Sequence, residues 1–336
     1  MPESMANRLV RGIIRNPLLI FLIVIVIAVQ LTTGSLLNWQ NLRGVLMDGA
    51  VIAIVAIPCA MLIIAGYIDL SVGSTLALGG VVGGMIMSRF GDPALAVIAA
   101  VGAGAIVGLF NGFLTCRFGL SAFITTLGTL TAVRGVAQLL SPLPRSSFGD
   151  AFGFLGVGTL LGIPVSVWIA GILLVVAGLF LARTPGGRHV YAIGVNREAA
   201  YLSGVNVSRL PFVLFILSGA AAGFAGTITA ARLNSAPAGQ LGLGFELTVL
   251  TAVLLGGIAL TGGEGSMFGV FIGVLFLGIL NNSLTLIGVT SFWQSVASGL
   301  ALIAAIALSA YTHVLRQRLE ANEAKKLAEL TTTSAS

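Results

Sequence analysis

The chain has 336 residues, of which 57% are hydrophobic and only 8% are charged, and its formal net charge is +6. A soluble domain carries about 25% charged residues, so this composition excludes a water-soluble globular protein. It also excludes a disordered chain, which would be poor in apolar residues and rich in charge. The protein is therefore predicted to lie in a lipid bilayer.

Apolar runs long enough to cross a bilayer, about 20 residues each, occur ten times along the chain, and only the fifth contains a charge. In chain order they are Asn16–Asn41, Gly49–Ile68, Ser71–Ser88, Pro93–Cys116, Phe118–Leu140, Pro164–Ala182, Pro211–Ala231, Leu247–Gly263, Met267–Ile287 and Phe292–Tyr311. We therefore predict an all-α, polytopic bundle of about ten spans over residues 17–311, with tails at 1–16 and 312–336. The pattern Gly219-x-x-x-Gly223 predicts a close approach between helices.

The Lys and Arg residues of the loops indicate the orientation of these spans. If the N-terminus is cytoplasmic, twelve of them lie inside and four lie outside, namely Arg43, Arg89, Arg145 and Arg232. Because cytoplasmic loops carry the excess of positive charge, both termini are expected in the cytoplasm. The net positive charge is then explained by topology, and no nucleic-acid partner is expected.

The longest predicted cytoplasmic loop, residues 183–210, contains the signals of a short helix. Asn196 is a good N-cap, Glu198 complements the positive end of the helix dipole, and Gly204 suits the position after the C-cap. A two-turn helix over Arg197–Ser203 is thus expected, and it would be either a docking element or an ordinary ordered loop. Three of its residues are apolar where a cytosolic loop would favour charge: Ala199, Ala200 and Leu202.

Uncharged hydrogen-bonding side chains at membrane depth are candidates for a substrate pathway or for hydrogen bonds between helices. They are Asn111, Thr125, Thr126, Gln138, Asn281 and Asn282. Arg134 is expected about 24 Å along its helix, where it would either anchor at the outer interface or line the pathway. Asp69 and Ser71 stand where either could cap the third span.

Several kinds of chemistry have no counterpart in the sequence. The chain has no Gly-x-x-x-x-Gly-Lys-Ser/Thr motif, so it is not expected to bind a nucleotide. His189 and His313 are isolated from one another, so no metal site is expected, and no nucleophile constellation suggests an enzyme.

The run Gly66–Ser74, Gly-Tyr-Ile-Asp-Leu-Ser-Val-Gly-Ser, resembles the Gly-x-Ile-Asp-Leu-Ser-Val-Gly signature of sugar-type ABC importer permeases of the ribose/xylose/galactoside branch. The signature positions are Asp69, Leu70, Ser71 and Gly73. Three further stretches resemble that family in order and spacing: Asn111–Gly112 with Phe123–Thr129 and Arg134–Gly135, Ala192–Gly194 with Asn196, Glu198–Ala200 and Ser203–Val205, and Leu217–Gly219 with Gly256–Gly257. The resemblance covers about residues 41–311. Two residues depart from the pattern, since Ser121 stands where Pro is common and Tyr67 where Gly is usual.

This resemblance implies a permease subunit in a bacterial inner membrane that pairs with a second permease, either a copy of itself or a sister chain. It would bind cytosolic ABC ATPase subunits, which use ATP-Mg, and receive a pentose or hexose from a periplasmic sugar-binding protein. Asn196–Gly204 would match the coupling helix, including Arg197 and Ser203. The alternative is a secondary transporter driven by an ion gradient. It would need ionisable relays at mid-depth, and the spans offer only Arg134 and acids at their boundaries.

Overall fold

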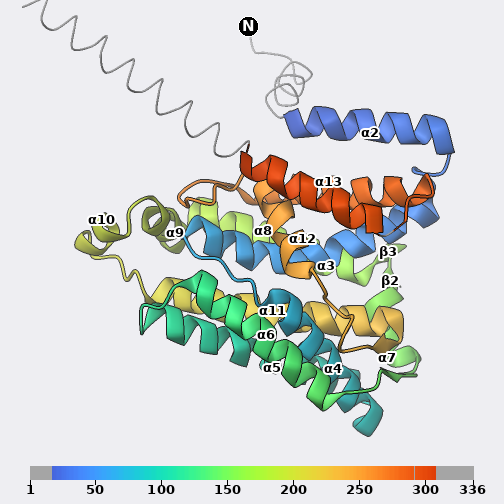
Figure 1. The fold of residues 1–336 in the computed structure, drawn as a ribbon, viewed down its shortest axis with the longest axis horizontal. Helices are drawn as coiled ribbons and strands as arrows, with labels where there is room; N and C mark the ends of the chain where they lie inside the picture. Colours follow the sequence, from blue (N-terminus) through green and yellow to red (C-terminus); the bar gives the residue numbers. More distant parts are fainter. Residues whose placement is uncertain (1–16, 291, 308–336) are drawn as a thin grey trace, which may run out of the picture.

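The computed structural model describes residues 17–290 and 292–307, which form a bundle of helices with two very short two-stranded sheets (Figure 1). The elements are α2 (Pro17–Thr33), α3 (Trp39–Ile64), α4 (Val72–Phe90), α5 (Pro93–Cys116), α6 (Ala122–Leu140), β1 (Arg145–Ser146), α7 (Asp150–Val157), β2 (Thr159–Leu160), β3 (Ile163–Pro164), α8 (Val165–Arg183), α9 (Pro185–Val195), α10 (Arg197–Leu202), α11 (Arg209–Leu233), β4 (Ser235–Ala236), α12 (Phe245–Leu255) and α13 (Met267–Leu286). A further helix covers Phe292–Ala307. β1 pairs antiparallel with β4, and β2 with β3.

Six of these helices are long and apolar enough to cross a membrane: α3, α5, α6, α8, α11 and α13. They confirm the prediction of a multi-pass, all-α membrane protein. The count of ten spans and the cytoplasmic position of both termini stay predictions, because the two tails and residues 308–311 of the tenth span lie outside the described residues.

The first two predicted spans had wrong boundaries. The first helix ends at Thr33 rather than Asn41, and α3 begins at Trp39 instead of Gly49. The start of α3 is fixed by Asn38, whose side-chain oxygen accepts a hydrogen bond from the backbone N–H of Gln40 at 3.0 Å. Asp48, which precedes the predicted second span, and Arg43, which follows the predicted first span, therefore both lie inside α3.

The eighth predicted span, Leu247–Gly263, is not a helix long enough to cross a membrane. Its helix, α12, has only 11 residues, about 16 Å at 1.5 Å per residue. It ends at Gly256–Gly257, where Gly257 adopts a φ of 82° that other residues rarely adopt. The chain from 256 to 266 then continues as turns and irregular structure.

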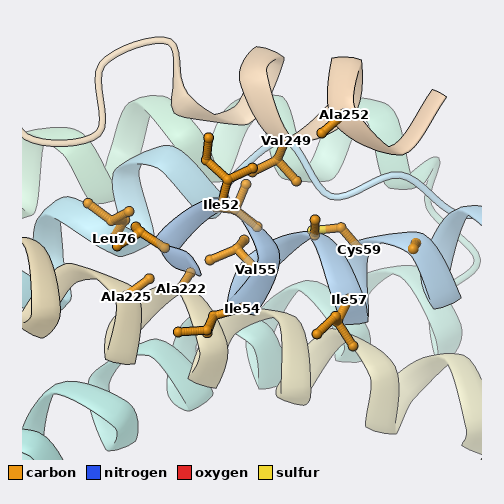
Figure 2. Close-up of a cluster of buried hydrophobic side chains, with 14 of the residues drawn as sticks. Ile52, Ile54, Val55, Ile57, Cys59, Leu76, Ala222, Ala225, Val249 and Ala252 are labelled. Carbon is orange, nitrogen blue, oxygen red and sulfur yellow. The ribbon is translucent and has the colours of Figure 1, made fainter. Parts of the chain in front are cut away.

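The core is built around α3, which is buried along almost its whole length. Figure 2 shows α3 crossing the cluster, with Ala222 and Ala225 of α11 on one side and Val249 and Ala252 of α12 on the other. A helix that is apolar all round needs helices on every side, and α3 is such a helix.

Glycines let α11 approach α5 and α4 backbone to backbone. A Cβ at Gly219 would overlap the carbonyl oxygen of Gly104, and one at Gly223 would overlap that of Ala100. On the other side, a Cβ at Gly226 would overlap the carbonyl oxygen of Leu76. The close packing predicted from Gly219-x-x-x-Gly223 is confirmed.

Within residues 17–290 and 292–307, arginines that were predicted on the outer side lie together at one end of the bundle. Seven of the twelve Lys and Arg residues predicted inside lie outside the described residues, so the twelve-to-four count stays a prediction. Arg43 donates to the carbonyl of Val157 at 2.6 Å, next to α7, and Arg232 pairs with Asp48. Arg145 lies in β1, which contacts α4 together with β4. The opposite end carries α9 and α10 (Figure 1). We call these the Arg43 end and the α10 end.

Candidate functional site: the coupling segment and the turn beneath it

The short helix predicted in the loop 183–210 is present as α10. Asn196 accepts a hydrogen bond from the N–H of Ala199 at 2.9 Å, and Gly204 follows the helix with a φ of 83°. A second helix, α9, precedes it and was not predicted. Its signal was in the sequence, because Thr184 caps the helix by accepting from Gly187 N–H at 3.0 Å and Pro185 takes the first helical position.

α10 presents apolar side chains to solvent at the end of the bundle. Tyr201 is 67% exposed, Leu202 is 78% exposed, and Val195 just before the helix is 73% exposed. Ala199 is exposed as predicted, but the prediction for Ala200 was wrong, since its side chain is only 5% exposed and packs against the core. The exposed face is therefore shifted toward Tyr201 and Leu202.

α9 and α10 are attached to the C-terminal end of α3. Gly194 lies so close that a Cβ there would overlap the carbonyl oxygen of Ile64, and the same oxygen accepts from Gly263 N–H at 2.8 Å. The hydroxyl of Tyr191 donates to the carbonyl of Gly265 at 2.9 Å. Burial raises the pKa of the Tyr191 phenol, so the hydroxyl keeps its proton.

The turn between α3 and α4, residues 65–71, holds the signature residue Asp69 in a buried position. Its Oδ1 accepts from the backbone N–H of Ser71 at 3.0 Å and from the Ser71 hydroxyl at 2.6 Å. Its Oδ2 accepts from the hydroxyl of Ser218 on α11 at 2.8 Å. Ser71 is the N-cap of α4, but its side chain makes no capping bond. Asp69 thus fixes the entry to α4 and ties it to α11.

The hydrogen bonds continue from Ser71 into α5 and α6. The amide of Asn111 donates to the Ser71 hydroxyl at 2.8 Å, and its oxygen accepts from the hydroxyl of Thr129 at 2.7 Å. We call Asp69, Ser71, Asn111, Thr129 and Ser218 the Asp69 network. Thr129 and Ser218 were not named as site residues, although both belong to the family-like stretches.

Two signature residues remain: Leu70 is buried, and Gly73 faces the segment that leads into α12. A Cβ at Gly73 would lie 2.7 Å from the carbonyl oxygen of Gly242 and would overlap the Glu246 carboxylate. Arg134 of α6 donates to three carbonyls of the same segment, those of Ala238, Leu241 and Gly242. Arg134 therefore fastens α6 to residues 238–242.

The other candidate pathway residues do not meet in one cavity. The Thr126 hydroxyl donates to its own helix at Ala122, Gln138 is exposed and Thr125 is buried. Asn282 exchanges two 2.8 Å hydrogen bonds with Asn41, which joins α13 to α3, and Asn281 accepts from Ser298 at 3.4 Å. For Asn111 and Asn282 these contacts favour the interhelical alternative.

An apolar groove of about 580 Å³ opens between α5 and α6. Ile106, Phe110 and Ile124 line it, and its hydroxyl groups come from Ser121, Thr125 and Thr129. Thr129 is thus both a wall of the groove and a member of the Asp69 network. Within residues 17–290 and 292–307, no three His, Cys, Asp or Glu side chains gather so as to hold a metal ion.

Known proteins resemble the chain over most of its length. The family model described as "Branched-chain amino acid transport system / permease component" matches residues 41–306. The ribose import permease protein of Escherichia coli (strain K12) is 38% identical over 293 residues, 86% of this chain and 91% of that protein. The L-arabinose ABC transporter permease protein of Azospirillum brasilense is 33% identical over 313 residues, 91% and 90% of the two chains. The D-allose transport system permease protein of Escherichia coli (strain K12) is 35% identical over 293 residues, 86% and 89%. No solved structure matches significantly.

Proposed function

We propose that this chain, which belongs to the branched-chain amino acid transport system permease family, is the membrane-spanning permease subunit of an ATP-driven importer for a monosaccharide. The carrying observation is its identity, 33–38% over most of its length, with permeases named for ribose, L-arabinose and D-allose. The description of the family names amino acids, whereas these three relatives are named for sugars. The substrate class follows the relatives, so a pentose or hexose is the expected cargo.

The chain is a translocation component, and the energy of transport comes from a partner that hydrolyses ATP-Mg. α10 is the proposed docking element for this ATPase. Its exposed Tyr201 and Leu202 would insert into the partner, while Asn196 and Gly204 hold the helix ends. The buried Ala200 and the contact of Gly194 with Ile64 seat the helix on the bundle.

The proposed setting is a bacterial inner membrane, with the α10 end in the cytoplasm and the Arg43 end in the periplasm. This orientation follows from the excess of basic residues at the α10 end. A sugar-binding protein would dock at the Arg43 end, and a second permease, either a copy of this chain or a sister chain, would complete the pathway.

Reconstitution tests this function. The chain should co-purify with an untagged ATPase subunit, and proteoliposomes with a binding protein should take up ribose, L-arabinose or D-allose in a vanadate-sensitive manner. Leucine, the substrate class suggested by the family description, serves as the control cargo. Uptake by this chain alone, driven by an ion gradient, would overturn the proposal.

A narrower experiment tests the role of α10. The substitutions Glu198→Arg and Ala199→Arg change exposed positions of α10, so the chain should insert normally while binding-protein-stimulated ATP hydrolysis falls. Thr159→Arg, an exposed position in β2 at the Arg43 end, is the matched control for co-purification with the ATPase and for ATP hydrolysis measured without the binding protein, which is proposed to dock at that end. Equal co-purification and equal ATP hydrolysis in all three variants would remove α10 from the docking surface.

A further inference from the structure

We propose that the turn 65–71 and the Asp69 network relay the movement of α10 to α6, and that Thr129 is the positioning residue at the α6 end of this relay. The inference rests on the proposed function, because α10 moves only if an ATPase acts on it. The relay consists of three successive contacts: α10 to the turn, the turn to α5 and α11, and α5 to α6.

The first contact joins α10 to the turn through close packing. Gly194, two residues before the N-cap of α10, touches the backbone of Ile64, which is the last residue of α3. The guanidinium of Arg197 lies 5.8 Å from the centre of the Tyr67 ring, close enough for a cation–π interaction. The Tyr67 ring in turn packs against Phe215 of α11 in a T-shaped arrangement, with 6.0 Å between the ring centres. A displacement of α10 therefore presses directly on the turn.

The second contact joins the turn to the bundle through Asp69. Its carboxylate accepts three hydrogen bonds in a buried site, from two groups of Ser71 and from Ser218. A buried acceptor that loses its donors without replacement carries the full cost of desolvation. Breaking one of these three hydrogen bonds alone is therefore costly. The turn is expected to move together with α4 and α11, so that all three bonds are preserved.

The third contact reaches α6 through Asn111 and Thr129. Asn111 is fully buried, and its amide bonds Ser71 on one side and Thr129 on the other at 2.8 and 2.7 Å. α6 is the least buried of the six long apolar helices, so fewer contacts resist its displacement. Thr129 also lines the groove between α5 and α6, and a shift of α6 would change the shape of that groove.

Three variants of α6 test the relay in the assembled complex with ATPase and binding protein. Thr129→Val removes the hydroxyl that donates to Asn111 with little change of volume. Thr129→Ser keeps a hydroxyl at this position and should therefore retain the function that Thr129→Val loses. Thr131→Val is the matched control, because Thr131 lies on the same helix, is exposed, and donates only to its own helix at Leu127.

Two readouts separate a relay from a structural role. The first is the number of sugar molecules imported per ATP hydrolysed, measured together with the thermal midpoint of the complex. The second is hydrogen exchange of the backbone amides in residues 122–140 and 197–202, compared between the nucleotide-free and the vanadate-trapped complex. In the wild type, trapping should change exchange in both segments.

For Thr129→Val we expect sugar imported per ATP to fall at least threefold. The thermal midpoint should also fall, because Asn111 Oδ1 is left buried without a donor, so the pattern of hydrogen exchange, rather than the midpoint, distinguishes a relay from a structural role. Exchange should still change at 197–202 but no longer at 122–140, and Thr129→Ser should recover both readouts. If Thr129→Val behaves like Thr131→Val while the wild type imports sugar, the relay is overturned and the proposed function stands. If the wild-type complex shows no vanadate-sensitive import, the proposed function falls and the relay with it.

Discussion

The crossing of α5 and α11 makes a quantitative prediction about a single methyl group. In Gly104→Ala, the new Cβ would overlap the carbonyl oxygen of Gly219 and would lie 2.9 Å from its carbonyl carbon and 3.0 Å from the nitrogen of Gly223. Ordinary van der Waals contact begins near 3.4 Å. The obstructing atoms are all backbone, so no side chain can turn away, and the two helices must separate by about 1 Å or slightly more to restore normal contacts.

The cost follows from the contacts that such a gap weakens. A gap of about 1 Å forfeits roughly half of the attraction of each atom pair, which is about 0.1–0.2 kcal/mol at contact. With on the order of 50 pairs at the crossing, the loss is about 2.5–5 kcal/mol, at or above the upper end of the typical cost of overpacking, about 1–3 kcal/mol. The hydrophobic effect does not offset this loss of packing, because the lipid chains around the helices are as apolar as the helix surfaces.

Gly102→Ala is the matched control, because nothing lies within 4 Å of a Cβ at that position of the same helix. This change should be neutral or should stabilise by up to about 1 kcal/mol, since Ala favours a helix more than Gly. Reversible unfolding of the purified chain in mixed detergent micelles, with SDS as the denaturant, measures both. Equal free energies of unfolding for the two variants would refute the packing argument.

Four other substitutions test three contacts elsewhere in the bundle. Asn41→Leu and Asn282→Leu should each destabilise the chain by about 1–2 kcal/mol, because each leaves the other amide unpaired. The double variant should cost less than the sum of the two, and additive unfolding free energies would contradict a shared hydrogen-bonded pair. Arg134→Lys should lower the unfolding free energy by about 1–3 kcal/mol, because an ammonium group cannot make the several hydrogen bonds by which the guanidinium holds residues 238–242. Unchanged resistance to unfolding by SDS would contradict this role of Arg134. Gly73→Ala should destabilise by about 1–3 kcal/mol through overpacking, and a thermal midpoint equal to the wild type in detergent would disprove the close approach.

The sequence predicts a feature of this chain well wherever the cause is local. The helix α10 follows from its own cap residues Asn196 and Gly204, and the close approach of α11 follows from its own glycine spacing. The separation of the arginines to two ends follows from the positive-inside rule. In each case the deciding groups lie within a few residues of the feature.

Features decided by distant partners could not be predicted. The composition of residues 247–263 predicts a full span, but the helix ends at Gly256. The chain after it is held by hydrogen bonds to Ile64 of α3 and to Tyr191 of α9, which lie far away in the sequence. From the sequence, Asn111 and Asn282 could each line a pathway or form hydrogen bonds between helices. Only the positions of their partners, Ser71 and Asn41, distinguish these two roles. Asp69 is separated from Ser218 by 149 residues, so no local pattern connects them.

The short helix α12 also has a consequence for how the protein is made. Its 11 residues cover about half of the roughly 30 Å of hydrocarbon, and the irregular chain after it carries backbone groups that lipid cannot satisfy. Those groups find partners at Ile64 and Tyr191, both of which precede the segment in the chain. When residues 245–266 leave the ribosome, the part of their docking site formed by α3 and α9 is already synthesised, whereas α13, which packs backbone to backbone against α12 at Ala252 and Gly256, still has to follow. The segment is therefore held by packing against helices on both sides of it in the chain rather than by a partition into lipid. Substitutions at its partners should consequently leave fewer chains in the membrane, through removal by quality-control proteases, before any defect in transport is measured.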